Sequence, residues 1–337
     1  MRDTPEDQAG QRLMVGFDGT EFNDDLAELI QTIRPGGLIL FSRNLETPDQ
    51  ISRLCRDCQK AASEAGIAPL FISIDQEGGR VSRLPSAFFR SFPGNPAMTD
   101  ASDAAEFARI TAADLQSLGI NMNMAPVLDV APPGMDSIMA GRAFGHDPEW
   151  VGMMGKTVID TLQGHGIMAV GKHFPGIGRT VLDSHHTLPD LDIDPAILFQ
   201  SDLVPFKTAI AAKVAGLMLS HIRYTAIDPV WPASLSPAVT QGMLRQTLGY
   251  EGVVMTDDLD MGAIKPAYDI FTAIEQILVS DVDMALICHK GPDIAAAHKC
   301  IVTLLADSPK LQSMGKVSIK RIMALKQAYV LKAIGTK

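Results

Sequence analysis

Short apolar runs recur along the whole chain, and a longer amphipathic stretch follows each of them. Runs of this length, bounded by Gly, Pro or charged residues, are typical of buried parallel strands. The eight runs are Leu13–Phe17, Gly37–Phe41, Leu70–Asp75, Ile120–Val130, Ile167–His173, Gly216–Ile222, Gly252–Asp258 and Met284–Cys288. We therefore predict eight strands.

The stretches between the runs carry apolar residues three and four positions apart, as a helix that covers one face of a sheet does. Regular alternation of this kind predicts parallel β/α units, and eight units favour a closed TIM-like (β/α)8 barrel over an open doubly wound sheet. No Gly-x-Gly-x-x-Gly follows the first run, which argues against a dinucleotide-binding fold. The helix-like stretches are Asp24–Ile33, Pro48–Ala65, Ala101–Leu118, Glu149–His165, Leu198–Lys213, Leu235–Leu248, Ala267–Val279 and Ile294–Ala306.

No Ser/Gly-rich linker, charge block or short repeat interrupts the pattern, so a single domain over residues 1–337 is expected. The barrel core should span about residues 12–310. A basic, amphipathic segment over about 316–334 is expected to cover the barrel, in preference to binding a membrane or a partner.

The charge balance limits the class of partner. The chain has 29 basic and 39 acidic residues, a net charge of −10, which argues against binding to nucleic acid. The first residues lack the apolar segment of a secretory signal, and no run approaches the roughly 18 apolar residues that cross a membrane. We therefore expect a monomeric, cytoplasmic protein that acts on a small molecule and has no membrane partner.

The four cysteines do not form a recognisable metal or disulfide pattern. Cys55 and Cys58 have the C-x-x-C spacing but lie in a helix-like segment, and a zinc ribbon would need a second such pair, which Cys288 and Cys300 do not supply. Ordinary reduced thiols are expected, with no disulfide and no cofactor.

Polar residues end five consecutive apolar runs. In a β/α barrel the C-terminal ends of the strands form the active site, and burying so many charges apart from one another would be expensive, so a shared cleft is expected. For Asp129, Asp258 and Glu77 a structural role is at least as good an interpretation. The residues at or after the strand ends are Asp75, Glu77, Arg80, Arg83, Asp129, Arg142, Lys172, His173, His221, Asp257 and Asp258.

Two enzyme classes suit this set of side chains. In one, a carboxylate of Gly252–Asp258 is a nucleophile and a loop imidazole donates a proton, which is the chemistry of glycosyl transfer to water. In the other, His173, His185, His186 and His221 with Asp257 hold a divalent metal for hydrolysis. The first strand lacks the His-x-His with which many metal-binding barrels begin, so the metal interpretation is the weaker one.

The segment KHFPGIGRTVLDSH resembles the KHFPGHGx(T/V)xxDSH motif of glycoside hydrolase family 3, and in particular its bacterial β-N-acetylhexosaminidases of cell-wall recycling. Further matches run in order through GGLILFSRN, SIDQEGGRVSRL, NMAPVLDV, GRAFGHDPEWV, LSHIRYTAIDP and GVVMTDDLDMGAI. The resemblance implies a catalytic barrel and a retaining, two-step removal of terminal N-acetylglucosamine from muropeptides and anhydromuropeptides.

The resemblance also assigns roles to residues. It implies that Asp257, and not Asp258, is the nucleophile, that His185 is the general acid/base, and that Asp183 orients His185. An Asp two residues from a His can hold the imidazole in one tautomer and raise its basicity. A neutral imidazole puts no negative charge beside an incoming anion, so phosphate in place of water is a conceivable acceptor.

The residues implied to bind the sugar are Asp75, Arg83, Arg142, Lys172 and His173. A structural ion pair is the competing role for Arg83 or Arg142. The chain departs from the family motif at Ile177, where the motif has a second His, which leaves the packing of that loop as a question for the structure. Besides the metal-dependent hydrolase, a sugar-binding barrel without catalytic activity is the remaining alternative.

Overall fold

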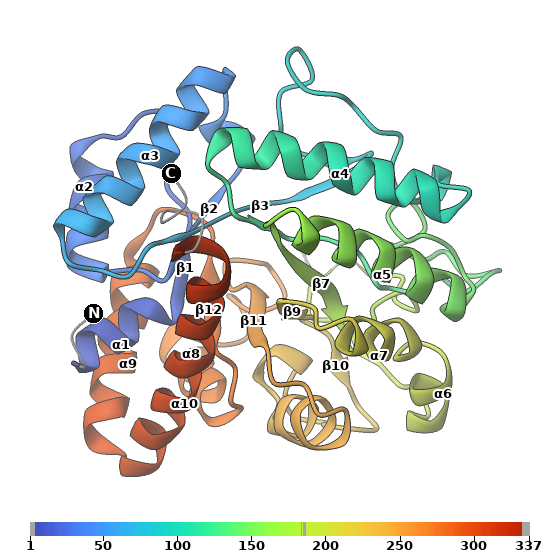
Figure 1. Cartoon of the computed structure of the whole chain (residues 1–337). Helices are drawn as coiled ribbons and strands as arrows, with labels where there is room; N and C mark the ends of the chain where they lie inside the picture. The colour runs from blue at the N-terminus through green and yellow to red at the C-terminus, as the bar shows by residue number, and fades with distance from the viewer. Residues whose placement is uncertain (1–3, 183, 185–186, 332–337) are drawn as a thin grey trace.

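The chain folds into a closed barrel of parallel strands, with the order β1-β12-β11-β9-β7-β6-β3-β2. The computed structural model describes residues 4–182, 184 and 187–331. The predicted (β/α)8 barrel is confirmed, and each predicted run contributes one strand (Figure 1). The barrel strands are β1 (Leu13–Val15), β2 (Gly37–Leu40), β3 (Phe71–Ile74), β6 (Met122–Asn123), β7 (Met168–Phe174), β9 (Gly216–Leu219), β11 (Val253–Asp258) and β12 (Met284–Ile287).

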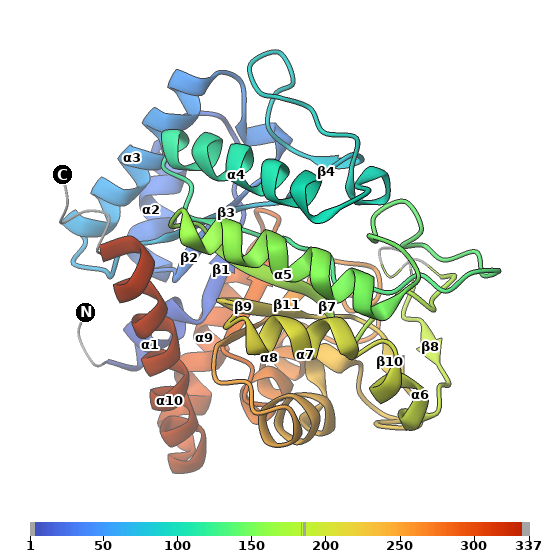
Figure 2. The ribbon, with the colours of Figure 1, turned by 45° about the vertical axis from the view of Figure 1, so that its right-hand side comes forward.

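Helices surround the barrel and connect one strand to the next (Figures 1 and 2). Several begin at a Ser, Thr, Asp or Asn whose side chain accepts from the first backbone N–H groups, and Pro often follows as the first helical residue. The helices are α1 (Pro5–Gln11), α2 (Asp24–Ile33), α3 (Pro48–Glu64), α4 (Ala101–Leu118), α5 (Pro148–Gly164), α6 (Pro195–Gln200), α7 (Val204–Ala211), the π-helical η4 (Ala238–Thr247), α8 (Ile270–Val279), α9 (Pro292–Asp307) and α10 (Pro309–Lys326).

Shorter elements lie on the loops that follow the barrel strands. β4 (Gln76–Gly78) pairs with β5 (Val81–Ser82) in an antiparallel hairpin after β3, and β8 (Asp190–Leu191) pairs with β10 (Arg223–Tyr224). The single turns on these loops are η1 (Ser42–Asn44), η2 (Asn95–Ala97) and η3 (Ala233–Leu235). The π-helical η5 (Gln327–Leu331) directly continues α10.

The structure differs from the sequence prediction at the fourth strand. The apolar run Ile120–Val130 forms only the two-residue β6, followed by an isolated bridge from Val127 to Lys172. Pro126 interrupts the run and has no N–H to donate to a neighbouring strand, so the ladder cannot continue through it. The segment after β6 therefore follows β7 irregularly, through single backbone hydrogen bonds, and brings Asp129 to His173 of β7.

Two helix predictions also need correction. The stretch Leu198–Lys213 forms two helices, α6 and α7, because the chain breaks at Ser201–Leu203, where the buried Asp202 accepts from Arg179. Helix α1 was not predicted, although Thr4 caps it, Pro5 begins it and acidic residues fill its first turn. These are ordinary signals for the start of a helix.

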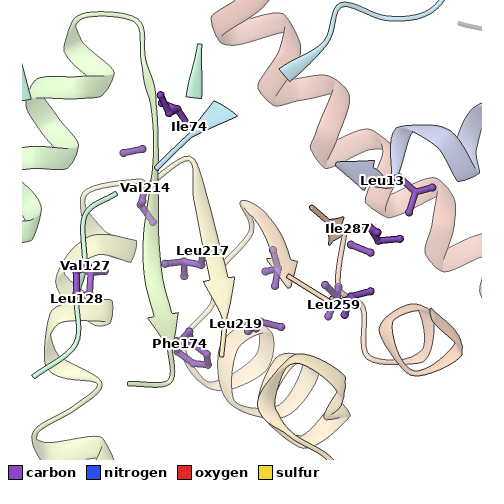
Figure 3. Close-up of a cluster of buried hydrophobic side chains, with 14 of the residues drawn as sticks. Leu13, Ile74, Val127, Leu128, Phe174, Val214, Leu217, Leu219, Leu259 and Ile287 are labelled. Atoms are coloured by element: carbon purple, nitrogen blue, oxygen red, sulfur yellow. The ribbon is translucent and has the colours of Figure 1, made fainter. Parts of the chain in front are cut away.

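Side chains fill the barrel interior, and many of them are methionines, whose unbranched side chains adapt to irregular spaces. Outside the strands, a larger apolar cluster lies beneath the helices, where Phe174 of β7 and Leu217 and Leu219 of β9 lie side by side (Figure 3). The interior cluster includes Met14, Phe71, Met122, Met124, Met168, Met218, Met255 and Met284.

Helix α10 closes the N-terminal end of the barrel, where it lies beside α1 and α9 (Figure 1). Ile319 and Ile322 of α10 and Val330 of η5 pack into the interior cluster. Arg321 pairs with Asp281 and Asp283, just before β12. With this end closed, the open end of the barrel is the C-terminal one, which carries the predicted site.

Two further observations bear on the predicted class of protein. Within residues 4–182, 184 and 187–331, none of the helices combines the length and apolarity that a membrane crossing requires. All four cysteines are buried with free thiols. Burial raises the pKa of the Cys55 thiol to about 12, which makes it a poor nucleophile or metal ligand at neutral pH.

Candidate active site

Asp75 and Lys172 meet at the C-terminal ends of β3 and β7, 97 positions apart in sequence. Lys172 Nζ donates to Asp75 Oδ1 at 2.7 Å and lies 2.7 Å from Glu77 Oε1. The lysine is only 3 % exposed, and its two carboxylate partners raise its pKa despite burial. Burial acts to raise the pKa of Asp75, but Lys172 and Arg83 outweigh it and hold that pKa below its usual value.

Arg142 joins this cluster through Glu77. Its Nε and Nη2 donate to the two oxygens of Glu77 at 3.0 and 2.7 Å, a bidentate pair with a carboxylate that is 2 % exposed. Arg83 is more exposed and lies 3.7 Å from Asp75 Oδ2, with its guanidinium above the ring of Phe41. Four of the five predicted sugar-binding residues, Asp75, Arg83, Arg142 and Lys172, therefore form one network, and Glu77 is its structural centre.

His173 follows Lys172 and is fixed by Asp129. Its Nδ1 lies 2.7 Å from Asp129 Oδ2, while Asp129 Oδ1 accepts from Ile177 N at 2.8 Å. Asp129 has no exposed surface; the His173 backbone N–H also donates to its Oδ1, and the Arg142 guanidinium is near enough to interact with it electrostatically. The Nδ1–carboxylate contact leaves the Nε2 side of the His173 ring as the one available for a ligand.

Asp257 lies at the C-terminal end of β11, close enough to Lys172, His173 and His221 to interact with them electrostatically. Its Oδ1 accepts from Asp258 N at 2.8 Å. Burial acts to raise the pKa of Asp257, but His173, His221 and Lys172 together outweigh it, so the pKa lies below its usual value. Asp257 is therefore an ionised carboxylate at neutral pH, as a nucleophile must be.

Asp258 has a different environment. Its Oδ1 accepts from Asp260 N and Cys288 N, each at 3.0 Å, and burial with the nearby Asp260 and Asp257 raises its pKa. The structure thus distinguishes the two neighbouring aspartates. The Asp258 carboxylate accepts hydrogen bonds from two backbone N–H groups, whereas Lys172 and two imidazoles keep Asp257 ionised.

His221 is a buried residue of the site whose role the sequence left open. Its Nδ1 lies 2.8 Å from Ser234 Oγ and its Nε2 lies 2.9 Å from the carbonyl oxygen of Asp258. Both ring nitrogens are therefore engaged within the protein. His221 therefore has no free ring nitrogen for the metal of the metal interpretation, whereas His173, bound to Asp129 through Nδ1, keeps its Nε2.

Among the described residues, one group could hold a metal ion: Asp258, Asp260 and His289. It contains none of the histidines of the metal interpretation. Lys265 Nζ already lies 2.8 Å from Asp260 Oδ1, which supplies a positive charge there. This group is explained by its own contacts and is not the expected metal centre.

The loop after β7 is held at both sides of the barrel mouth. Tyr224 Oη donates to the carbonyl oxygen of Gly176 at 2.8 Å, and Ile138 N donates to that of Thr180 at 3.1 Å. On the far side, Ala263 N donates to the Ser184 carbonyl oxygen at 3.0 Å, after β11. Thr180 therefore contacts the segment after β6, and Ser184 contacts the segment after β11.

The predicted Asp183 and His185, and the neighbouring His186, lie outside the described residues. The docking of Ser184 on the segment that follows Asp257 is the nearest described feature. The sequence placed Glu77 and His221 among the polar strand ends. It gave no sign that Glu77 pairs with Lys172 and Arg142 and so has a structural role, because such pairings are not visible in a single sequence.

The arrangement brings a low-pKa carboxylate next to a cluster of polar side chains rich in hydrogen-bond donors and acceptors. Such a cluster suits a ligand with several hydroxyl groups, and the carboxylate suits attack on an electrophilic carbon.

Comparison with known proteins supports this chemistry. The family model described as the glycosyl hydrolase family 3 N terminal domain matches residues 4–325. A β-hexosaminidase of Pseudomonas aeruginosa is 35% identical over 307 residues, 90% of each chain, and one of Thiobacillus denitrificans is 36% identical over 84% of this chain and 79% of its own length.

Solved structures give the same result. A glycoside hydrolase family 3 β-N-acetylglucosaminidase from Paenibacillus sp. superposes with a TM-score of 0.93 at 38% identity, over 98% of this chain and 64% of that one. This chain thus spans less than two thirds of that protein. A β-N-acetylhexosaminidase from Beutenbergia cavernae superposes with a TM-score of 0.87 at 27% identity, over 97% and 99% of the two chains. The chain belongs to glycosyl hydrolase family 3 and is a glycosidase.

Proposed function

We propose that the protein is a retaining exo-β-N-acetylglucosaminidase. The observation that carries the proposal is the ionised Asp257 at the mouth of the barrel, next to the Asp75–Lys172–Glu77 network, in a chain of this family. Relatives named β-hexosaminidase or β-N-acetylglucosaminidase support the same substrate class here.

In the proposed reaction, an Asp257 oxygen attacks the anomeric carbon while the bond to the leaving oxygen breaks. His185 donates its proton to that oxygen, and a glycosyl ester of Asp257 remains. His185 then takes a proton from water, whose oxygen attacks the anomeric carbon and releases Asp257 as a carboxylate. Two inversions retain the β configuration. Asp183 is proposed to hold the imidazole of His185 in the tautomer that these steps need.

We further propose that Asp75, Arg83, Arg142, Lys172 and His173 bind the terminal sugar. Lys172 donates one hydrogen bond to Asp75 Oδ1, and Arg83 stays 3.7 Å from Oδ2. Both oxygens of Asp75 can therefore still accept a hydrogen bond from a sugar hydroxyl. Arg142 uses two N–H groups on Glu77, which leaves other N–H groups of its five for a ligand.

The finer parts of the proposal concern the biological substrate. We propose anhydromuropeptides and muropeptides as substrates, water as the acceptor, and a monomer in the cytoplasm, where the four free, buried thiols would stay reduced. Release of N-acetylglucosamine from purified muropeptides, with and without phosphate, tests the first two points: accumulation of a sugar phosphate would replace hydrolysis by phosphorolysis. Light scattering and cell fractionation test the others.

The main experiment measures release of a phenol from an aryl N-acetyl-β-glucosaminide in the presence of EDTA. Turnover that survives chelation supports the proposal. Loss on chelation and return with added metal would favour a metal-dependent hydrolase, and binding of the sugar without release would favour a sugar-binding barrel.

Azide separates the two catalytic residues. In Asp257→Gly, azide should restore phenol release and yield the α-glycosyl azide, because it replaces the nucleophile. In His185→Ala, azide should yield the β-glycosyl azide, because it replaces activated water in the second step. Substrates with very good leaving groups should suffer least in His185→Ala, since they need no proton. A β-azide from Asp257→Gly would contradict the assignment.

A further inference from the structure

Strand β11 contains an irregularity at the position of the proposed nucleophile. On β12, Met284 and Leu286 are two residues apart, whereas their partners on β11, Met255 and Asp258, are three apart. The additional residue on β11 lies between these pairs, where Thr256 and Asp257 stand. A bulge of this kind leaves a residue outside the ladder and re-aims its side chain. The direction of Asp257 therefore depends on the contacts that stabilise the bulge.

Most of those contacts involve Asp258. Its carboxylate Oδ1 accepts from Cys288 N, just beyond β12, and from Asp260 N. Its own N–H donates to Asp257 Oδ1, and its carbonyl oxygen accepts from His221. Asp258 is thus fixed at its amide, its carbonyl and its side chain.

The Asp258 carboxylate is 15 % exposed, and no Lys or Arg pairs with it among the described residues. His289 Nδ1 lies 3.7 Å from Asp258 Oδ2. Burial, together with the nearby Asp260 and Asp257, raises the pKa of Asp258. Keeping a carboxylate here is electrostatically unfavourable, so its value lies in accepting the two N–H groups. A neutral amide oxygen could accept them as well.

The His221 ring approaches the same bulge from β9 and is 1 % exposed. A backbone carbonyl only accepts, so Nε2 carries the proton that it donates to Asp258, and Nδ1 accepts from the Ser234 hydroxyl. This is one tautomer of the neutral ring. This hydrogen bond joins the adjacent strands β9 and β11, and it fixes the peptide group between Asp258 and Leu259.

Resting on the proposed function, we propose that His221 and Asp258 are positioning residues: they lock the β11 bulge and so aim Asp257 at the anomeric carbon. His221 does so as a hydrogen-bond donor through Nε2, and Asp258 does so as an acceptor through Oδ1. Neither exchanges a proton with the substrate.

The two amide replacements of His221 test the donor. In His221→Gln the amide N–H stands at the place of Nε2 and can still reach the Asp258 carbonyl. In His221→Asn it stands at the place of Nδ1 and cannot. We expect His221→Asn to lower kcat about a hundredfold, the usual effect of misplacing a reacting group by about 1 Å, with KM changed only a few-fold. His221→Gln should remain within about tenfold of the wild type.

The same logic applies to Asp258. Asp258→Asn keeps an acceptor for Cys288 N and Asp260 N and should retain most of kcat, whereas Asp258→Ala should lose about as much as His221→Asn. Asp283→Asn is the matched control: it changes a buried aspartate at the other end of β12 and should lower the melting temperature without lowering kcat. An aryl glycoside whose leaving group needs no proton makes the measured rate report attack by Asp257.

Melting temperatures of all variants separate positioning from stability. Equal losses of kcat in His221→Gln and His221→Asn, or losses that follow the melting temperature and appear equally in Asp283→Asn, would overturn the inference. If His221→Asn or Asp258→Ala does not fold, Asp258→Asn tests the inference instead. A hundredfold lower kcat in Asp258→Asn than in the wild type would overturn the inference. Absence of turnover in the wild type would refute the proposed function and, with it, this inference. Wild-type kcat in His221→Asn and Asp258→Ala, beside an active wild type, would refute the positioning roles alone.

Discussion

Lys326 is a buried cation at the closed end of the barrel, and its replacement should stabilise the protein at neutral pH. Its Nζ donates to Gln11 Oε1 at 2.6 Å and lies 5.0 Å from the centre of the Phe71 ring, but no carboxylate pairs with it among the described residues. Burial lowers the pKa of Lys326 from 10.5 to about 7. The site therefore favours the neutral amine.

This difference makes the free energy of unfolding depend on pH. The unfolded chain keeps the proton up to about pH 10.5, whereas the folded chain loses it near pH 7. Between these values the unfolded state binds more protons, so this residue makes stability rise with pH. At pH 7 the unfavourable contribution is about 4 kcal/mol, and near pH 10 it falls below about 1 kcal/mol.

Lys326→Met removes that contribution but leaves Gln11 Oε1 without its donor, which costs about 1–3 kcal/mol. We expect a net gain of about 2 kcal/mol at pH 7 and a loss of about 1 kcal/mol at pH 10. Urea unfolding of variant and wild type at both pH values measures the difference, and other titrating groups cancel in it. Lys320→Met, an exposed lysine on the same helix, is the control. A variant that is less stable than the wild type at pH 7, or a difference independent of pH, would show that Lys326 stays ionised when folded.

Three further predictions concern the site. Lys172→Met leaves Asp75 and Glu77 buried without their shared cation and should lower the free energy of unfolding by about 3–5 kcal/mol in urea titrations; a loss below about 1 kcal/mol would contradict the network. Because the pKa of Asp257 lies below its usual 3.8, the carboxylate stays ionised above that pH, and the acid limb of kcat/KM due to it should fall below pH 3.8; a limb above pH 5 that moves when this residue is changed would refute the assignment. Ile177→His puts an imidazole into an apolar cluster and should destabilise the protein by about 1–3 kcal/mol, against less than about 1.5 for the control Ile177→Val, as measured by thermal unfolding.

The barrel could be predicted from sequence because each barrel strand, and most helices, carry a local pattern, either an apolar run or apolar residues three to four positions apart. Prediction failed where a distant partner or a single residue decides the local shape. Pro126 ends β6 although the apolar run continues, and Asp202, bonded to Arg179, marks the break between α6 and α7. Neither effect changes the periodicity of apolar residues.

The grouping of polar strand ends at one end of the barrel was predictable, but the pairing of their side chains was not. Collecting polar strand ends found Asp75, Lys172 and Asp257, because parallel strands bring their C-terminal ends together. The same rule could not show that Glu77 accepts both N–H groups of Arg142, or that the bulge beside Asp257 depends on a contact with Cys288, 30 positions away from Asp258. Such pairings follow from three-dimensional packing and leave no local pattern.

The family departure at Ile177 illustrates how a backbone contact can make a substitution harmless. Ile177 is 4 % exposed and its side chain joins the apolar cluster, so it fills space that needs no polar group. Its backbone N–H donates to Asp129, which in turn holds the ring of His173. Any residue except proline supplies that N–H. Holding His173 therefore does not require the imidazole that the family motif has at this position, which is the physical reason to expect sugar binding to survive the change.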